Sequence, residues 1–175
     1  QSRALQAAAA AERTIKERFR KWRKKPPKDL DAQFHAEHDA VFAATDCLTC
    51  GNCCRTTSPI IRERDLDRLA KHLRAKPGEV IDQYLRMDED GDWVFRSAPC
   101  PFLDLRDNRC AVYEHRPQAC REYPHTDRKH MAGILPLTAR NAGICPAVAA
   151  IVLRLADLGE SGKMRRRIRP SAHRM

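Results

Sequence analysis

The sequence predicts a small α-rich α+β protein, in which helices and short β-hairpins are organised around a cysteine-ligated metal centre. Three observations support this prediction. Apolar residues recur at helical spacing along much of the 175-residue chain. Turn signals interrupt this pattern in the middle of the chain. Eight cysteines supply enough thiolates to ligate a metal, which would support a modest core in which only 6% of the residues are aromatic.

The first part of the chain is expected to be helical. Ile15, Phe19 and Trp22 recur at i, i+4 and i+7, which predicts one apolar helix face. Two prolines end this helix, and residues 29–44 form a second amphipathic pattern. The cysteine run 47–54 is expected to be an irregular loop, because its central Gly-Asn pair suits a turn with positive φ.

The middle of the chain alternates helices with hairpins. Residues 63–74 carry a leucine stripe at helical spacing, and Pro77 suits the first turn of another short helix. Trp93–Phe95 reads as one strand of a hairpin that follows an Asp-Gly turn. Residues 100–112 are expected to form a second small hairpin, and residues 116–121 a brief helix.

The last part of the chain is expected to begin with a long loop, since residues 126–142 show no clean apolar period. Pro146 can then start a final helix. We expect three parts: an N-terminal helical extension over residues 1–44, a cysteine-cluster metal-binding domain over residues 45–158, and a basic, disordered tail over residues 159–175.

The net charge and the absence of common catalytic motifs limit the classes of function that the sequence supports. A formal net charge of +10 permits contact with nucleic acid, acidic proteins or anionic lipid without identifying one. No apolar run approaches the length of a membrane span. The absence of a convincing secretory signal leads us to expect a cytoplasmic protein. No GxGxxG, P-loop or GxSxG motif supports nucleotide-dependent chemistry or serine hydrolysis, and whether the chain is an enzyme stays open.

The cysteines are the most specific feature. Four lie in a Cys-x2-Cys-x2-Cys-Cys run and four follow at wider spacing: Cys47, Cys50, Cys53, Cys54, Cys100, Cys110, Cys120 and Cys145. Soft thiolates ligate zinc, iron and iron–sulfur clusters. The first three cysteines are spaced like the three-thiolate loop of a cubane cluster, whose fourth ligand usually comes from a distant cysteine. All eight are therefore candidate metal ligands.

The grouping of these ligands stays open. Eight thiolates suffice for two four-cysteine sites, or for one cluster with spare thiols. Neighbouring side chains diverge, so Cys53 and Cys54 are not expected to bind one ion in the same way. A plain zinc ribbon would need a second Cys-x2-Cys pair, which the sequence lacks. A disulfide framework is disfavoured, because cysteines this close together favour local ligation.

The cysteine run and the segments after it resemble the YkgJ-type cysteine-cluster family, a zinc- or iron-chelating domain named for its CxxCxxCC motif. The matching features are the run itself, Cys100-Pro-Phe-Leu, Arg109-Cys110-Ala-Val-Tyr113, the segment Arg116-Pro-Gln-Ala-Cys120-Arg-Glu-Tyr-Pro124, and Cys145. The resemblance covers roughly residues 45–150. It implies metal chelation through these eight cysteines, with an iron–sulfur cluster or zinc or iron ions as cofactor, and it implies no particular reaction.

Residues beside the later cysteines allow two interpretations. Arg116 and Arg121 either offset the charge of a thiolate cluster or fix nearby loop carbonyls, while Tyr123 packs the turn. His115 and His125 could complete a mixed site, although eight thiolates already suffice.

Three function classes follow. The first is an iron–sulfur protein for redox or electron transfer, which would need a protein redox partner. The second is a zinc-stabilised binding module for nucleic acid or a protein, using the basic runs Lys21–Lys25 and Arg165–Arg169. The third is a metal chelator or carrier with exchangeable thiolates.

Overall fold

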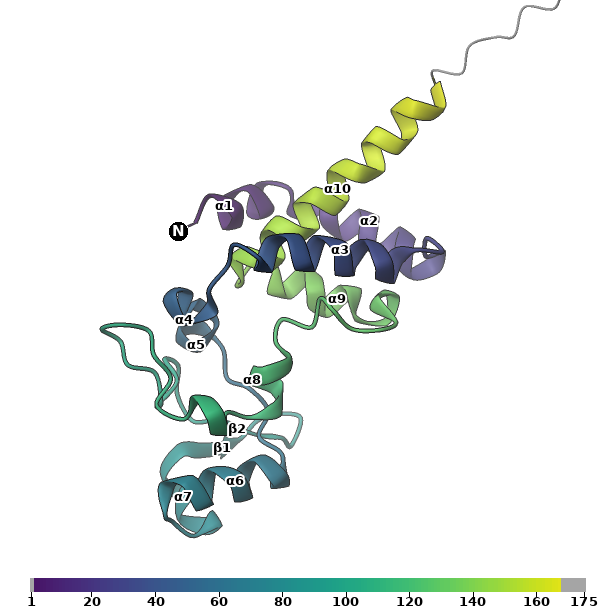
Figure 1. Cartoon of the computed structure of the whole chain (residues 1–175). Coiled ribbons are helices and arrows are strands. Elements are labelled where there is room, and N and C mark those ends of the chain that lie inside the picture. The colour runs from purple at the N-terminus through teal and green to yellow at the C-terminus, as the bar shows by residue number, and fades with distance from the viewer. Residues whose placement is uncertain (1, 168–175) are drawn as a thin grey trace, which may run out of the picture. The chain divides into compact units, whose positions relative to one another are not determined.

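The computed structural model describes residues 2–167, and side chains as far as residue 156 (Figure 1). The described chain is mostly helical and contains a two-stranded antiparallel sheet, which confirms the predicted α-rich α+β class. Contacts divide the chain into two compact units, which we call the helical unit (residues 1–45 and the chain from 124 onward) and the cysteine unit (residues 46–123). None of the described helices is both long and apolar enough to cross a membrane.

The helical unit is a bundle. Its helices are α1 (Arg3–Ala10), α2 (Glu12–Lys24), α3 (Leu30–Phe42), α9 (Met131–Asn141) and α10 (Pro146–Arg167). Ile15 and Phe19 are buried, as their spacing predicted, and the Phe19 ring lies 6.3 Å from that of Phe34. The buried positions of α10 complete this core. Its backbone stays helical to Arg167, within the segment predicted to be a disordered tail, and residues 168–175 lie outside the described part of the chain.

The prediction of a long loop over residues 126–142 is wrong, because α9 occupies most of this segment. Met131, Leu135 and Thr138 are buried at i, i+4 and i+7, although neighbouring Gly133 and Pro136 obscure this period in the sequence. The Asp31 carboxylate accepts hydrogen bonds from the backbone N–H groups of His130 and Met131, at 2.7 and 2.9 Å. Tertiary burial and this cap, supplied from α3, therefore outweigh the poor helix propensity of the segment.

The cysteine unit consists of short elements. They are α4 (Cys47–Cys50), α5 (Asn52–Thr56), α6 (Glu63–Leu73), α7 (Pro77–Tyr84), β1 (Leu85–Met87), β2 (Trp93–Phe95), the 3-10 helix η1 (Tyr113–His115) and α8 (Gln118–Glu122). The predicted helices at residues 63–74 and after Pro77 are confirmed, as is the first hairpin, in which Leu85 pairs with Phe95. The second predicted hairpin is reduced to an isolated bridge between Leu103 and Cys110.

The cysteine run is not the irregular loop that the sequence predicted, but two short helices separated by Gly51. The Asp46 side chain caps α4 by accepting a 2.8 Å hydrogen bond from the Leu48 N–H. Gly51 has a φ of 57°, as its sequence context suggested, and it ends α4 in the left-handed conformation. The positive φ was therefore correctly predicted, whereas the helices on either side of it were not.

Gly51→Ala is expected to lower the free energy of unfolding by about 2 kcal/mol, because an L-residue is strained in the left-handed region. A Cβ at this position would also lie 2.8 Å from the Asn108 Oδ1 atom. Urea unfolding of the variant measures the loss. Gly78→Ala is the matched control, because nothing lies within 4 Å of a Cβ built there. Equal stability of the two variants would contradict the strain argument.

Candidate metal centre

The eight cysteines, all in the described part of the chain, are present as thiols and differ in exposure. Cys47 and Cys50 are exposed on α4, and the remaining six are partly buried. Seven belong to the cysteine unit. Cys145 instead lies just before α10 and packs against the hydrophobic core of the helical unit.

Four of these cysteines gather within the cysteine unit, and we call Cys54, Cys100, Cys110 and Cys120 the inner thiols. The Cys100 N–H donates a 2.8 Å hydrogen bond to the Cys54 carbonyl oxygen, which joins the end of the run to the next segment. The bridge between Leu103 and Cys110 brings Cys110 back beside Cys100. The inner thiols come from four separate positions along the chain, yet each lies within electrostatic range of others in the group.

Burial and mutual repulsion keep three inner thiols protonated. Burial, followed by the charges of neighbouring inner thiols, raises the pKa of Cys100 to about 11 and that of Cys120 to about 12. The pKa of Cys110 is raised for the same reasons. Without a cation beside them, these three thiols therefore stay neutral at neutral pH.

The pKa of the Cys54 thiol is lowered, unlike that of the other three inner thiols. A hydrogen bond from the Cys53 thiol, with the two sulfur atoms 3.9 Å apart, lowers the pKa of Cys54 to about 7 despite its partial burial. Near neutral pH, a substantial fraction of Cys54 is therefore thiolate, the form in which cysteine ligates metals. The two adjacent cysteines have different roles here, since one sulfur donates a hydrogen bond to the other.

These pKa directions predict how the stability of the metal-free protein depends on pH. The folded state holds the Cys100 and Cys120 protons more tightly than the unfolded chain, whose thiols have the ordinary pKa of about 9. This stabilising difference is fully present below pH 9 and is lost as the pH rises toward about 12. We expect the Tm of metal-free protein to fall above pH 9, and to fall less in a Cys100→Ser/Cys120→Ser variant. If the Tm of both proteins fell equally above pH 9, the proposed contribution of Cys100 and Cys120 would be contradicted.

A polar contact centred on Asn108 connects the cysteine run to the segment between Cys100 and Cys110. The Asn108 Oδ1 atom accepts hydrogen bonds from Arg55 Nη2 and Nε, at 2.7 and 3.2 Å. Its Nδ2 atom donates to the Thr49 carbonyl oxygen at 3.0 Å. Asn108 therefore holds both α4 and α5 against the chain that carries the next two cysteines.

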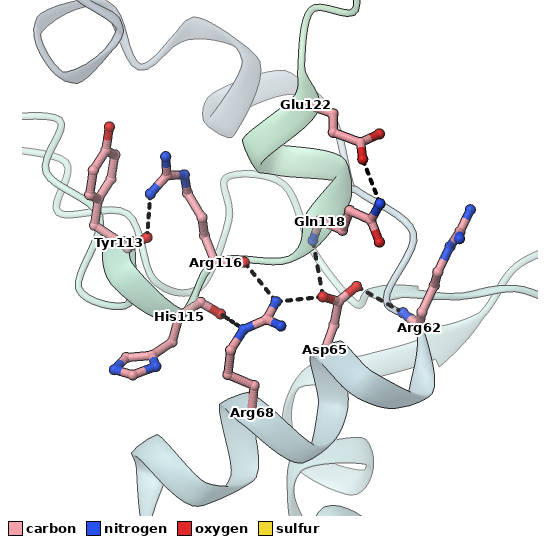
Figure 2. A network of polar contacts seen from close by, with 8 residues as sticks. All are labelled: Arg62, Asp65, Arg68, Tyr113, His115, Arg116, Gln118 and Glu122. Carbon is pink, nitrogen blue, oxygen red and sulfur yellow. Dashed lines mark hydrogen bonds and ion pairs between the residues drawn. The ribbon is translucent and has the colours of Figure 1, made fainter.

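A second polar network connects α6 to the start of α8 (Figure 2). Asp65 is 2% exposed, and its carboxylate accepts from the Gln118 N–H at 3.0 Å and from Arg68 Nη2 at 2.5 Å. Arg68 also donates to the Arg116 carbonyl oxygen at 3.0 Å. Because Gln118 is the first residue of α8, the Asp65 carboxylate satisfies an N–H that has no partner within that helix. This network therefore orients the short helix that carries Cys120.

Of the residues named beside Cys120, Arg116 has a double role. Its guanidinium lies 3.8 Å from the Tyr113 ring centroid and donates a 2.6 Å hydrogen bond to the Tyr113 carbonyl oxygen. Its positive charge also opposes the rise in the pKa of Cys110 and Cys120 that burial causes. The structural and electrostatic interpretations of Arg116 are therefore compatible. The His115 ring stacks on His72, with centroids 4.2 Å apart, a contact that the sequence analysis did not identify.

The donor set of the inner thiols fits a thiophilic metal. Four partly buried sulfur atoms that resist ionisation together would become a favourable ligand set once a cation balanced their charge. Within residues 2–156, no three His, Cys, Asp or Glu side chains already have the arrangement of a metal-ion site. The inner thiols thus lie near one another as soft donors, but they do not form a complete coordination sphere.

The fold is small and mostly helical, and several of its cysteines lie near one another. These two features are typical of the class of cysteine-cluster metal-binding proteins. Residues 46–142 match the CxxCxxCC family, described as "Putative zinc- or iron-chelating domain", and the chain belongs to this family. It is 32% identical over 85 residues to a Methanocaldococcus jannaschii protein named "Uncharacterized protein MJ0661". That match takes in 47% of this chain and 46% of the relative, so the chain spans about half of the relative's length. No solved structure matches the chain.

Proposed function

We propose that the chain holds an iron–sulfur cluster through Cys54, Cys100, Cys110 and Cys120, and that it transfers electrons to a protein partner in the cytoplasm. The convergence of the inner thiols is the observation that supports this proposal. Membership of the CxxCxxCC family supports zinc or iron binding in general. The iron–sulfur cluster, its four ligands and its redox role are the parts that we propose in addition to this general metal binding.

The protonation states suggest an order of ligation. Cys54, with a pKa of about 7, offers the first thiolate to an incoming cation. Cys100, Cys110 and Cys120 would then lose their protons more readily, because a bound cation would offset the burial and repulsion that raise their pKa values. Ligation therefore releases protons and strengthens as the pH rises from neutral.

An iron–sulfur cluster in this position would supply one-electron redox chemistry. The protein's own contribution is to exclude water partly from the sulfur atoms and to place Arg116 where its charge favours the thiolate forms of Cys110 and Cys120. Both factors would influence the reduction potential. The metal-binding domain proposed at residues 45–158 would include Cys145, which belongs to the helical unit.

The exposure of Cys47 and Cys50 favours a second candidate function, that of a metal chelator or carrier. Their positions at i and i+3 on α4 place both side chains on one helix face. Thiols that solvent can reach exchange metal with other ligands more readily than partly buried ones. In this proposal, Cys47 and Cys50 pass metal to the inner thiols or accept it from them.

Elemental analysis with an absorption spectrum of protein purified without oxygen tests the proposal. Iron with acid-labile sulfide and a broad visible band would support a cluster, and a reversible potential would support electron transfer. Stoichiometric zinc without a visible band would refute the cluster while retaining four-thiolate ligation. Rapid loss of metal to a competing chelator, slowed by Cys47→Ser/Cys50→Ser, would favour the carrier.

A further inference from the structure

The positive charge of this chain is concentrated outside the cysteine unit. Residues 12–28 contain nine Lys and Arg but only two Glu. Residues 29–156 contain 17 Lys and Arg against 19 Asp and Glu, and are therefore slightly acidic overall. The net charge of +10 therefore comes from residues near the two ends of the chain. Of these basic segments, the one whose side chains the structure describes is α2 with the residues directly after it.

The helix α2 presents this charge on the face turned away from the core. Ile15 and Phe19 are buried against the helical unit. With 100° between successive helical residues, Arg13, Arg20 and Lys24 fall within a narrow stripe on the opposite side. All three are exposed. We call them the outer basic stripe, and Lys21, Lys25 and Lys28 continue the exposed charge around it and beyond the end of the helix.

Acidic side chains offset only part of the positive charge of α2 and the residues directly after it. Among the side chains described in residues 12–28, the ion pair found is between Lys16 and Glu12. Arg18 is directed elsewhere, since its guanidinium lies 5.7 Å from the centroid of the Trp22 ring. Glu17 lies on the same face, between Arg13 and Arg20, but nine Lys and Arg against two Glu in residues 12–28 leave a net positive local potential that attracts an anionic polymer.

The surface around the stripe favours nucleic acid over other polyanions. A protein partner usually needs large apolar anchors at the centre of its interface, but the large exposed hydrophobic side chains described here all belong to the cysteine unit. A membrane-surface helix must insert its apolar face into lipid, but α2 uses Ile15 and Phe19 in the core. A phosphodiester backbone requires neither, because Lys and Arg contacts to phosphate supply sequence-independent affinity.

We propose that the outer basic stripe of α2 binds the phosphate backbone of nucleic acid. The helical rise spaces Arg13 and Arg20 by about 10 Å, and Arg20 and Lys24 by about 6 Å, along one line. Such a line can contact several phosphates without reading base edges. Binding is therefore independent of base sequence and depends strongly on salt. The cysteine thiols take no part in this contact, so nucleic-acid binding is expected whichever metal the cysteines hold.

The test uses the full chain and fluorescently labelled duplexes of DNA and of RNA, each of about 20 base pairs, in anisotropy titrations at several salt concentrations. Arg13→Gln/Arg20→Gln/Lys24→Gln should weaken binding at least about tenfold, and should reduce the slope of log K against log salt by about 2 to 3. The matched control removes equal charge from exposed positions of the cysteine unit, in Arg64→Gln/Lys71→Gln/Arg86→Gln. This control should bind like the unchanged chain.

Each outcome decides the proposal. Equal losses in the two triple variants would mean that net charge alone drives binding, which overturns a site on α2. Unchanged binding in the α2 variant would place the contacts elsewhere and overturn it as well. Stronger binding to poly-glutamate or to anionic vesicles than to either duplex would reassign the stripe to an acidic protein or a membrane. Circular dichroism of both variants checks that the helices are retained.

Discussion

Cys120→Ser is expected to remove most of the bound metal, whereas Cys145→Ser is expected to retain most of it. Cys120 belongs to the inner thiols, and burial together with three neighbouring thiols raises its pKa to about 12. A serine hydroxyl is a hard and far weaker ligand for a thiophilic metal. In the proposed four-thiol site, loss of one ligand should also weaken metal binding by the other three. Metal per protein chain, measured by elemental analysis, gives the result directly.

Cys145→Ser is the appropriate control because the two substitutions are chemically identical and both cysteines are partly buried. Cys145 lies in the helical unit, against its hydrophobic core. Its replacement should therefore change packing more than metal content. Equal metal loss in the two variants would show that Cys145 is a ligand, as the wider family resemblance implies, and would refute a site formed by the inner thiols alone.

Asp65→Ala is expected to lower the free energy of unfolding by about 2–3 kcal/mol and to weaken metal binding as well. The substitution leaves the Gln118 N–H without its acceptor and removes the ion-pair partner of Arg68 (Figure 2). The start of α8 then loses its direct attachment to Asp65, and only the hydrogen bonds of Arg68 to the carbonyl oxygens before α8 remain, so Cys120 is held less firmly among the inner thiols. Because Arg68 is 27% exposed, water compensates part of its lost ion pair, which limits the effect.

Two measurements separate the contributions of Asp65. Urea unfolding of metal-free protein reports the structural loss, and competition with a metal chelator at a temperature where both proteins are folded reports the positioning of Cys120. Asp67→Ala is the matched control, since Asp67 is an exposed acidic residue on the same helix. If Asp65→Ala were no less stable than Asp67→Ala, the network would not stabilise the fold. If its metal affinity matched that of Asp67→Ala, Asp65 would not position Cys120.

The part of the fold that was predictable rests on local patterns. Ile15 and Phe19 mark the buried face of α2, Pro77 starts α7, and Gly51 adopts the positive φ that its context suggested. The first hairpin follows from its turn signal and strand residues. In each case the information lies within about ten residues, over which periodicity and turn chemistry act.

The errors occurred where distant residues decide the conformation. Gly133 and Pro136 made the segment of α9 look like a loop, but burial of Leu135 and the cap from Asp31 stabilise a helix there. The cysteine run was expected to be irregular, but the capping of α4 by Asp46 and the contacts of Asn108 support two short helices. Local propensity is a weak energy that tertiary burial readily exceeds.

Residue pattern and spacing were enough to predict that this protein is α-rich, that it belongs with cysteine-cluster proteins, and that eight thiols are available for soft metals. These properties depend on composition and on short spacings. Which thiols lie near one another depends on packing, because Cys54 and Cys120 come within electrostatic range through contacts such as that between Asp65 and Gln118, 53 residues apart. The tertiary structure also decided that the Cys53 thiol lowers the pKa of Cys54 while burial raises that of Cys120. Proximity and burial arise when the chain packs, and the spacing of residues along the sequence does not encode either one directly.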